Sequence, residues 1–358
     1  MTIWPTKKLG EIIEISYGKG LPKDSRVDSG KYFAYGSNGP VYGTDESLTN
    51  GETIIIGRKG TAGALYFVSE PCWPIDTTFF AKPKSEVSLK FVYYLLQTKR
   101  LPSLAIVTGV PGINRTTLSN IHVQLPPPAI QKQIVERLDK IAEVQKLNDG
   151  LIQKTDELFQ SLLHKELNPV GKDWKIKKLS EIGDIITGTT PSTQNADYWN
   201  GEFLWATPTD IKKDTFMLTD TPKKLSREGY EKTRPVPKNA ILVTCIASIG
   251  KMAIAGKEMA TNQQINSIVC KKENDPFFIF FSLQKDKKKL ILLGKTTAVP
   301  IINKSEFGRI KIFLPPLEVQ KKIVAKLSAV QDYKKQLLGQ KAKLKELFDS
   351  ALAESMKN

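Results

Sequence analysis

Residues 125–138 read LPPPAIQKQIVERL, and this stretch decides how the chain is organised. Its prolines cannot lie inside a helix but suit a helix's first turn, where no backbone N–H is needed. After them, apolar residues recur at spacings of three, four or seven as far as Leu162, which predicts a helix with one apolar stripe. At ~1.5 Å per residue this helix would be roughly 55–60 Å long. A helix of that length must lay its stripe against a partner of similar length.

The chain supplies that partner, because residues 314–327 read LPPLEVQKKIVAKL and keep one register with the first copy over the whole helical stretch. A second repeat opens each half: WPTKKLGEIIEISYGK (4–19) matches WKIKKLSEIGDIITGT (174–189). The protein is therefore a tandem duplication. The repeats are offset by 170 residues at the openings and by 189 at the helices, so the second half carries nineteen extra residues. We expect them around PSTQNADYWNG (191–201) and the polar stretch that follows.

Between its opening motif and its long helix, each half is predicted to form a mixed α/β domain, because short apolar runs bounded by glycine are typical of strands. The expected strands are 53–56, 64–68, 78–80, 240–243, 252–255 and 265–269, and the expected helices are 89–96 and 276–283. The predicted fold class is α+β, with two mixed α/β domains, two long antiparallel coiled-coil-like helices and a pseudo-two-fold internal repeat. The antiparallel arrangement is favoured because only about eight residues (165–172) join the first helix to the second domain. The expected boundaries are 1–125, 126–168, 169–314 and 315–358.

The apolar stripes predict which side chains lie between the two helices. The expected interface residues are Ile134, Leu138, Ile141, Leu151, Leu158, Leu162, Ile323, Leu327, Val330, Leu337, Leu344, Leu347 and Ala351. Polar residues interrupt the heptad pattern: Gln145, Asn148, Thr155, Lys334 and Lys341. They either fix the register of the pair, as single polar residues do in coiled coils, or face solvent where the helices diverge.

Composition excludes several classes of function. The formal charge of +16 predicts an anionic partner, and no apolar run is long enough for a membrane span. The N-terminus lacks a signal peptide, and Cys72, Cys245 and Cys270 form no CxxC pair, so we expect buried thiols in a reducing cytoplasm. The two histidines have no ligand-spaced neighbours, which argues against a metal site. No phosphate-binding, dinucleotide-binding or amino-methyltransferase motif is present, so we expect no catalytic residues, no metal and no cofactor.

What remains is binding chemistry in loops of both halves. Lys and Arg bind phosphates or read guanine, and Asn or Gln can read adenine with two hydrogen bonds. The candidate DNA-binding residues of the first half are Lys19, Lys23, Arg26, Ser37, Asn38, Arg58, Lys59, Thr61, Asn114 and Arg115. Those of the second half are Thr189, Thr190, Ser192, Gln194, Asn195, Ser248, Lys251, Asn262, Gln263, Gln264, Asn303 and Lys304.

The repeated LPPxxxQ-plus-helix segments, the WxxKKLxEI openings, TPSTQNADYWNG and ATNQQIN resemble the specificity subunit of type I restriction–modification systems. This resemblance covers essentially the whole chain. It implies a non-catalytic subunit in which each globular unit is a target recognition domain that reads one half of a bipartite, asymmetric double-stranded DNA site. The helix pair would set the spacer and dock two methyltransferase (modification) subunits, and restriction/translocase subunits would complete the assembly. S-adenosylmethionine, ATP and Mg would be bound by those partners.

Two other classes stay open at this point. One is an enzyme in its own right, a nuclease or methyltransferase, against which the missing motifs argue. The other is a coiled-coil scaffold whose end domains bind protein or carbohydrate. A scaffold of that kind does not need so basic a chain, so the charge of +16 favours DNA.

Overall fold

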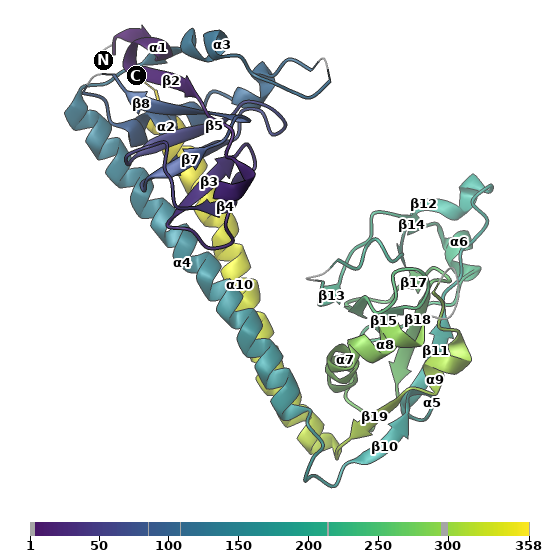
Figure 1. Ribbon diagram of the computed structural model, residues 1–358. Coiled ribbons are helices and arrows are strands. Elements are labelled where there is room, and N and C mark those ends of the chain that lie inside the picture. Colours follow the sequence, from purple (N-terminus) through teal and green to yellow (C-terminus); the bar gives the residue numbers. More distant parts are fainter. Residues whose placement is uncertain (1–3, 85, 108, 213–214, 295–299, 358) are drawn as a thin grey trace. The chain divides into compact units, whose positions relative to one another are not determined.

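The computed structural model describes residues 4–84, 86–107, 109–212, 215–294 and 300–357 (Figure 1). Contacts divide the chain into two compact units. Unit 1 comprises Met1–Leu151 and Leu338–Asn358, and unit 2 comprises Ile152–Leu337. Each unit contains a globular head and a segment of each long helix, α4 (Pro128–Glu166) and α10 (Leu317–Ser355).

The head of unit 1 is built from two small sheets. The first is antiparallel in the order β2 (Ile13–Tyr17), β8 (Thr78–Pro83), β5 (Thr53–Gly57), β6 (Leu65–Val68). The second has the order β4 (Gly39–Thr44), β3 (Tyr32–Gly36), β7 (Cys72–Pro74), with β3 and β7 parallel. Helix α2 (Leu89–Gln97) places Phe91 and Leu95 in the core that also holds Ile54 and Phe79. The expected strands and helix of this half are confirmed.

The head of unit 2 repeats this plan with additions. Its larger sheet has the order β11 (Gly183–Thr187), β18 (Ile265–Cys270), β15 (Ile241–Thr244), β16 (Met252–Ala255), β13 (Met217–Leu218). Its smaller sheet has the order β14 (Lys224–Leu225), β12 (Trp199–Ala206), β17 (Ala260–Thr261). The remaining elements include η3 (Ala196–Tyr198), α6 (Arg227–Glu231), α7 (Pro276–Lys285) and α8 (Lys287–Leu293). The predicted strands and helix of the second half are confirmed as well.

The opening repeats form a strand pair that closes each head. In unit 1, β1 (Thr6–Lys8) pairs with β9 (His122–Gln124), and the Leu9 N–H donates to the Ile121 carbonyl. In unit 2, β10 (Lys175–Lys178) pairs with β19 (Lys311–Leu314), and the Leu179 N–H donates to the Ile310 carbonyl. A short helix adjoins each strand: α1 (Leu9–Ile12) follows β1 and α5 (Leu179–Ile182) follows β10, whereas α3 (Arg115–Ser119) precedes β9 and α9 (Lys304–Gly308) precedes β19. The opening motif therefore pairs the first strand of each head with its last strand, which leads into the long helix.

The extra residues of the second half lie in one part of the region where we expected them, the polar stretch that follows 191–201. The Ile75 N–H donates to Tyr35 in unit 1, and the Asn262 N–H donates to Ala206 at the same place in unit 2. Counted from the openings, Tyr35 and Ala206 are almost level, whereas Asn262 lies 17 residues further along its half than Ile75, so the stretch 191–201 is not the insertion. Most of the extra residues lie between Ala206 and Thr244, where unit 2 adds β13 at the sheet edge and α6. Polarity alone could not distinguish an insertion from a loop of equal length and different sequence.

The long helices run antiparallel, as predicted. In unit 1, Arg137 pairs with Glu354 (2.7 Å) and Asp149 with Lys341 (2.9 Å). In unit 2, Asp156 pairs with Lys334 (2.7 Å) and Glu166 with Lys326 (3.0 Å). Within each unit, later residues of α4 meet earlier residues of α10, which only antiparallel helices allow.

The seam between the helices follows the prediction in part. Ile134, Leu138, Ile323, Leu327, Leu337 and Ala351 are buried, and Ile141, Leu162, Val330 and Leu344 are half-buried. Leu151, Leu158 and Leu347, which were expected in the seam, are instead 44%, 51% and 52% exposed. The seam passes through Asn148 and Thr155, each 5% exposed, because a heptad step from Ile141 reaches these positions and not the nearby leucines. The misplaced leucines form a second stripe beside the seam.

The glutamine of each LPPxxxQ segment is buried and has the same structural role in both units. Gln131 is 1% exposed; its amide donates to the Pro126 carbonyl (2.8 Å) and accepts from the Ser88 N–H (2.9 Å). Gln320 is 1% exposed and makes the same two bonds, to Pro315 (2.8 Å) and from Asp275 (2.9 Å). Ser88 and Asp275 cap α2 and α7. Each glutamine therefore fastens the start of a long helix to the start of a head helix.

Candidate nucleic-acid interface

Four loops of unit 1 are joined to one another by main-chain hydrogen bonds. They are 18–20 after β2, 57–63 between β5 and β6, 74–77 between β7 and β8, and 106–114 before α3. The Lys19 N–H donates to Pro74 (2.9 Å), the Arg58 N–H to Thr77 (2.9 Å) and the Gly60 N–H to Pro111 (3.1 Å). We call this set of four loops the loop face of unit 1.

Unit 2 has the same loop face, formed by 188–190, 244–250, 261–264 and 300–303. The Thr189 N–H donates to Thr261 (2.8 Å), the Cys245 N–H to Gln264 (2.8 Å) and the Ala247 N–H to Pro300 (3.0 Å). Ala247 has a φ of +58°, a left-handed conformation that glycine adopts at the matching position 60 (φ +78°). Because a non-glycine residue keeps that conformation, the geometry of the loop is common to both faces.

The loop face of unit 1 is cationic. The guanidinium carbons of Arg58 and Arg115 lie 5.2 and 5.3 Å from the centroid of the Tyr17 ring, and Tyr17 is 49% exposed. Lys59 is exposed beside Arg58. A ring that orients two guanidinium groups leaves their N–H donors available for phosphate or guanine, which they can bind with two parallel hydrogen bonds.

The loop face of unit 2 combines one arginine with neutral polar groups. The positions of Arg58 and Lys59 are occupied by Cys245, which is buried, and Ile246. The Arg234 Nε donates to the Thr189 hydroxyl (3.0 Å), and the Thr190 hydroxyl donates to the Gln263 side-chain oxygen. Bonding of the oxygen fixes the orientation of the exposed Gln263 amide, whose N–H groups remain available as donors.

The sequence comparisons agree with this duplicated geometry. The sequence model of one family, described as the type I restriction modification DNA specificity domain, matches residues 1–155 and again 171–346. The chain belongs to this family.

Curated relatives in this specificity-domain family are also specificity subunits. The type I restriction enzyme HindI specificity subunit of Haemophilus influenzae is 34% identical over 44% of this chain and 36% of its own length. The putative type I specificity subunit S.MpnORF507P of Mycoplasma pneumoniae is 22% identical over 90% of this chain and 88% of its own. The matched segments span about a third to a half of the length of the first two curated relatives.

A solved structure has the same fold. The S subunit of a type I restriction–modification system from M. genitalium aligns with all of this chain and 97% of its own, with a TM-score of 0.72 and 17% sequence identity. At that identity the likeness concerns the fold alone, which it supports over the full length of this specificity-domain protein.

The other candidate residues of unit 1 lie at varied distances from the loop face. Lys19, Thr61 and Asn114 are in its loops, and the Ser37 hydroxyl lies beside Gly60, so the turn holding Ser37 and Asn38 adjoins the face. Lys23 lies in the short helix η1 (Lys23–Ser25). Arg26 donates to the Leu21 carbonyl (2.9 and 3.2 Å) and stacks on Tyr42, so its side chain already holds a loop in place.

Several amides of the candidate set are used inside the protein. Asn114 and Asn303 cap α3 and α9 and Asn195 caps η3, because each side-chain oxygen accepts a backbone N–H. Asn262 donates to Gln264 (3.0 Å) and is buried, while the Lys251 ammonium donates to the Pro208 carbonyl (3.2 Å). Ser192, Gln194, Ser248 and Lys304 are exposed in or near the loops. Of the three consecutive amides 262–264, Gln263 is therefore the best placed to contact a ligand.

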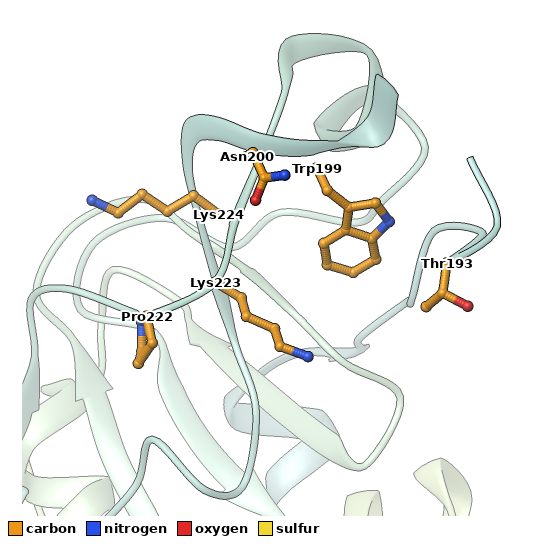
Figure 2. Close-up of a pocket in the computed structure, with 6 residues that line it drawn as sticks. All are labelled: Thr193, Trp199, Asn200, Pro222, Lys223 and Lys224. Atoms are coloured by element: carbon orange, nitrogen blue, oxygen red, sulfur yellow. The ribbon is translucent and has the colours of Figure 1, made fainter. Parts of the chain in front are cut away.

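Sequence reasoning missed two features of unit 2. Arg234 reaches the loop face from the inserted stretch, and its position carries no motif that could have identified it. A hollow of about 320 Å³ is lined by Thr193, Trp199, Asn200, Pro222, Lys223 and Lys224; Figure 2 shows these side chains. The Lys223 side chain extends below the Trp199 ring, whereas Lys224 points away and pairs with Asp220 (3.1 Å).

The described residues offer little for other chemistry. Among them, no three His, Cys, Asp or Glu side chains are placed to hold a metal ion. Burial raises the pKa of Cys245 to about 11 and that of Cys270 to about 12, so both are protonated thiols at neutral pH. None of the helices in the described ranges is long and apolar enough to cross a membrane.

Proposed function

We propose that this chain is the non-catalytic DNA-specificity subunit of a type I restriction–modification complex. Each head reads one half of a bipartite, asymmetric double-stranded DNA site through its loop face. The observation that carries the proposal is the same four-loop framework on two heads with different side chains, which suits two different half-sites. The charge of +16 supports an anionic ligand for both faces.

The helix pair is the proposed docking site for methyltransferase subunits. In unit 1, Val144, Leu147, Leu151, Leu344 and Leu347 line a groove of about 420 Å³ with Asn148, Gln340 and Lys343. Exposed apolar residues recur at matching positions of the two helices, because Val144 and Leu158 correspond to Tyr333 and Leu347. A duplicated apolar surface supports two copies of one partner, and S-adenosylmethionine, ATP and Mg would be bound by such partners. Restriction/translocase subunits and a cytoplasmic location belong to the same proposal.

The test is a titration of DNA against the complex of this chain with its methyltransferase subunits, at several salt concentrations. The recognised sequence is first obtained by single-molecule sequencing of DNA methylated by the complex. We expect log affinity to fall with log salt by ~0.9 per phosphate contact. Replacing Arg58, Lys59 and Arg115 together by Ala should weaken binding and reduce that slope by about one per lost phosphate contact.

A matched control is available in exposed cations outside the loop face. Lys154, Lys175 and Lys232 are exposed and take no part in the four loops. Their combined replacement by Ala should leave the slope nearly unchanged. Equal effects of the two triple variants would mean that net charge, and not the loop face, directs binding.

A further inference from the structure

The loop 106–114 of unit 1 carries exposed apolar side chains that the proposed phosphate contacts do not use. Ile106, Val107 and Val110 are 58%, 72% and 70% exposed. The Ile106 N–H donates to Gly112 (2.8 Å) and the Gly112 N–H donates back to Ile106 (3.1 Å), so two chain segments run side by side. Figure 1 shows this narrow hairpin projecting beyond α3. We call the segment that carries Ile106, Val107 and Val110 the tip; three large exposed apolar side chains within five residues of the chain make it a candidate interaction site.

The tip is tied directly to the cationic loop. Lys59 bridges to Gly112, the Gly60 N–H donates to Pro111 (3.1 Å), and the Ile113 N–H donates to Arg58 (2.9 Å). Any surface bound by Arg58 and Lys59 therefore lies beside the apolar tip. The two features are therefore close enough to contact the same ligand.

The charge beside the tip favours a polyanion as the ligand. Arg58 and Lys59 are joined to the tip by main-chain contacts, and Arg115 follows loop 106–114 directly in the chain. The one exposed carboxylate in the four loops is that of Asp76, in loop 74–77. An apolar projection inside a cationic surround matches a nucleic-acid groove, whose phosphates flank apolar base surfaces, better than it matches a protein surface.

Unit 2 has apolar groups in the same region of its own face. Leu292 and Leu293 of α8 are 61% and 55% exposed, and Ile301 is 46% exposed. Ile301 bridges to Ile246 in loop 244–250, as Gly112 bridges to Lys59 in unit 1. Unit 2 therefore also carries exposed apolar side chains, on α8 and in loop 300–303.

We propose that Ile106, Val107 and Val110 enter the major groove of the DNA and make apolar contacts with base edges, next to the phosphates bound by Arg58, Lys59 and Arg115. This inference rests on the proposed function and deepens it. The major groove admits a two-stranded ribbon, and the thymine methyl group is the apolar feature that a valine or isoleucine can read there. The tip then contributes sequence readout, while the cations contribute sequence-independent affinity.

The test compares V107S/V110S with V170S in the complex with methyltransferase subunits. Val170 is 80% exposed and lies outside both loop faces, so it controls for loss of an exposed valine. We expect V107S/V110S to bind its specific duplex about tenfold more weakly, the size of one mismatched base pair, with an unchanged salt slope and unchanged affinity for random DNA. V170S should bind like the parent chain. A duplex with uracil in place of thymine in the half-site of unit 1 should reduce the difference between V107S/V110S and the parent.

Other outcomes would overturn the inference. If V107S/V110S binds DNA like the parent chain while the triple Ala variant of Arg58, Lys59 and Arg115 binds more weakly, that result would exclude a role of the tip in DNA binding and leave the proposed function intact. Loss of methyltransferase subunits from V107S/V110S on gel filtration assigns the tip to a protein interface. A duplex with 2-aminopurine in the half-site of unit 1 reports unstacking of bases by an increase in fluorescence. If the parent chain causes that increase, V107S/V110S does not, and uracil has no effect, the valines insert between bases and do not contact base edges. If neither variant changes DNA binding, the loop face itself is wrongly assigned.

Discussion

Single side chains account for much of how the heads are attached. Gln131 and Gln320 each bond a proline carbonyl and the N–H of a helix-cap residue while fully buried. A buried polar group that loses its partner costs about 1–3 kcal/mol, more than the bond itself contributes. The identity of these glutamines follows from that requirement, because an apolar side chain of the same size would leave an N–H and a carbonyl unsatisfied.

The first prediction concerns Gln131→Leu. We expect it to lower the free energy of unfolding of unit 1 by about 1–3 kcal/mol, because the Ser88 N–H and the Pro126 carbonyl lose their partner. Gln133, two residues on, is exposed, and Gln133→Leu should change stability by less than about 0.5 kcal/mol. Urea unfolding followed by circular dichroism measures both; equal destabilisation by the two variants would contradict the role of the buried amide.

The helix pair shows how far element-scale reasoning from the sequence reaches. The proline start, length and direction of both helices were predictable from the LPP segments, the apolar period and the short connection between α4 and the second head. The seam was not, because α4 carries two neighbouring apolar stripes and the sequence does not say which one the partner covers. Asn148 and Thr155 lie in the seam, while Leu151 and Leu158 lie outside it. Loop contacts of the heads depend on tertiary placement, so the sequence could not indicate Arg234; Arg58 and Arg115 could be named as candidates, and their contact with DNA stays a prediction.

A second prediction compares a leucine of the buried seam with a leucine of the exposed stripe, both in α10 and both replaced by Ala. Leu337 is 2% exposed and Leu347 is 52% exposed. Leu337→Ala should cost about 2–5 kcal/mol, as truncations of buried leucine do. Leu347→Ala should cost less than about 1 kcal/mol but weaken binding of methyltransferase subunits, measured by isothermal calorimetry. Normal methyltransferase binding by Leu347→Ala would argue against docking at the groove.

A third prediction concerns the length of the helices. Deleting 149–155 and 335–341 together removes one heptad from each helix and one ion pair, Asp149–Lys341, while keeping the pattern of the seam. Each helix becomes shorter by about 10.5 Å, or seven residues at ~1.5 Å. We expect the methylated sites to show a shorter spacer between unchanged half-sites, as mapped by single-molecule sequencing. A spacer of the original length would exclude the helices as its determinant.

At the scale of the whole molecule, duplication has kept a framework and changed its surfaces. Both units share the closing strand pair, the buried glutamine and the four-loop face. They differ in the side chains of that face and in the stretch between Ala206 and Thr244. The duplicated plan and the family were predictable from the repeated openings and the repeated long helices. The extra residues were expected over 191–201 and the polar stretch that follows, and they lie in the latter; the repeats fix only the total number of extra residues and not their position.

A fourth prediction follows from this separation of framework and surface. Replacing residues 1–125 by the corresponding segment of another family member should change one half-site only, with the other half-site and the spacer retained. The sequence motif of the methylated sites provides the measurement. A change in both half-sites would mean that the heads do not read DNA independently.

The buried glutamine has one more consequence. Since the same two bonds fasten each head to its long helix, the fastening does not depend on what the head reads. Exchange of gene segments at the repeated LPPxxxQ codons would therefore deliver a new head already equipped with its attachment. New pairings of half-sites can arise in a single recombination event, without a period in which the protein is unstable.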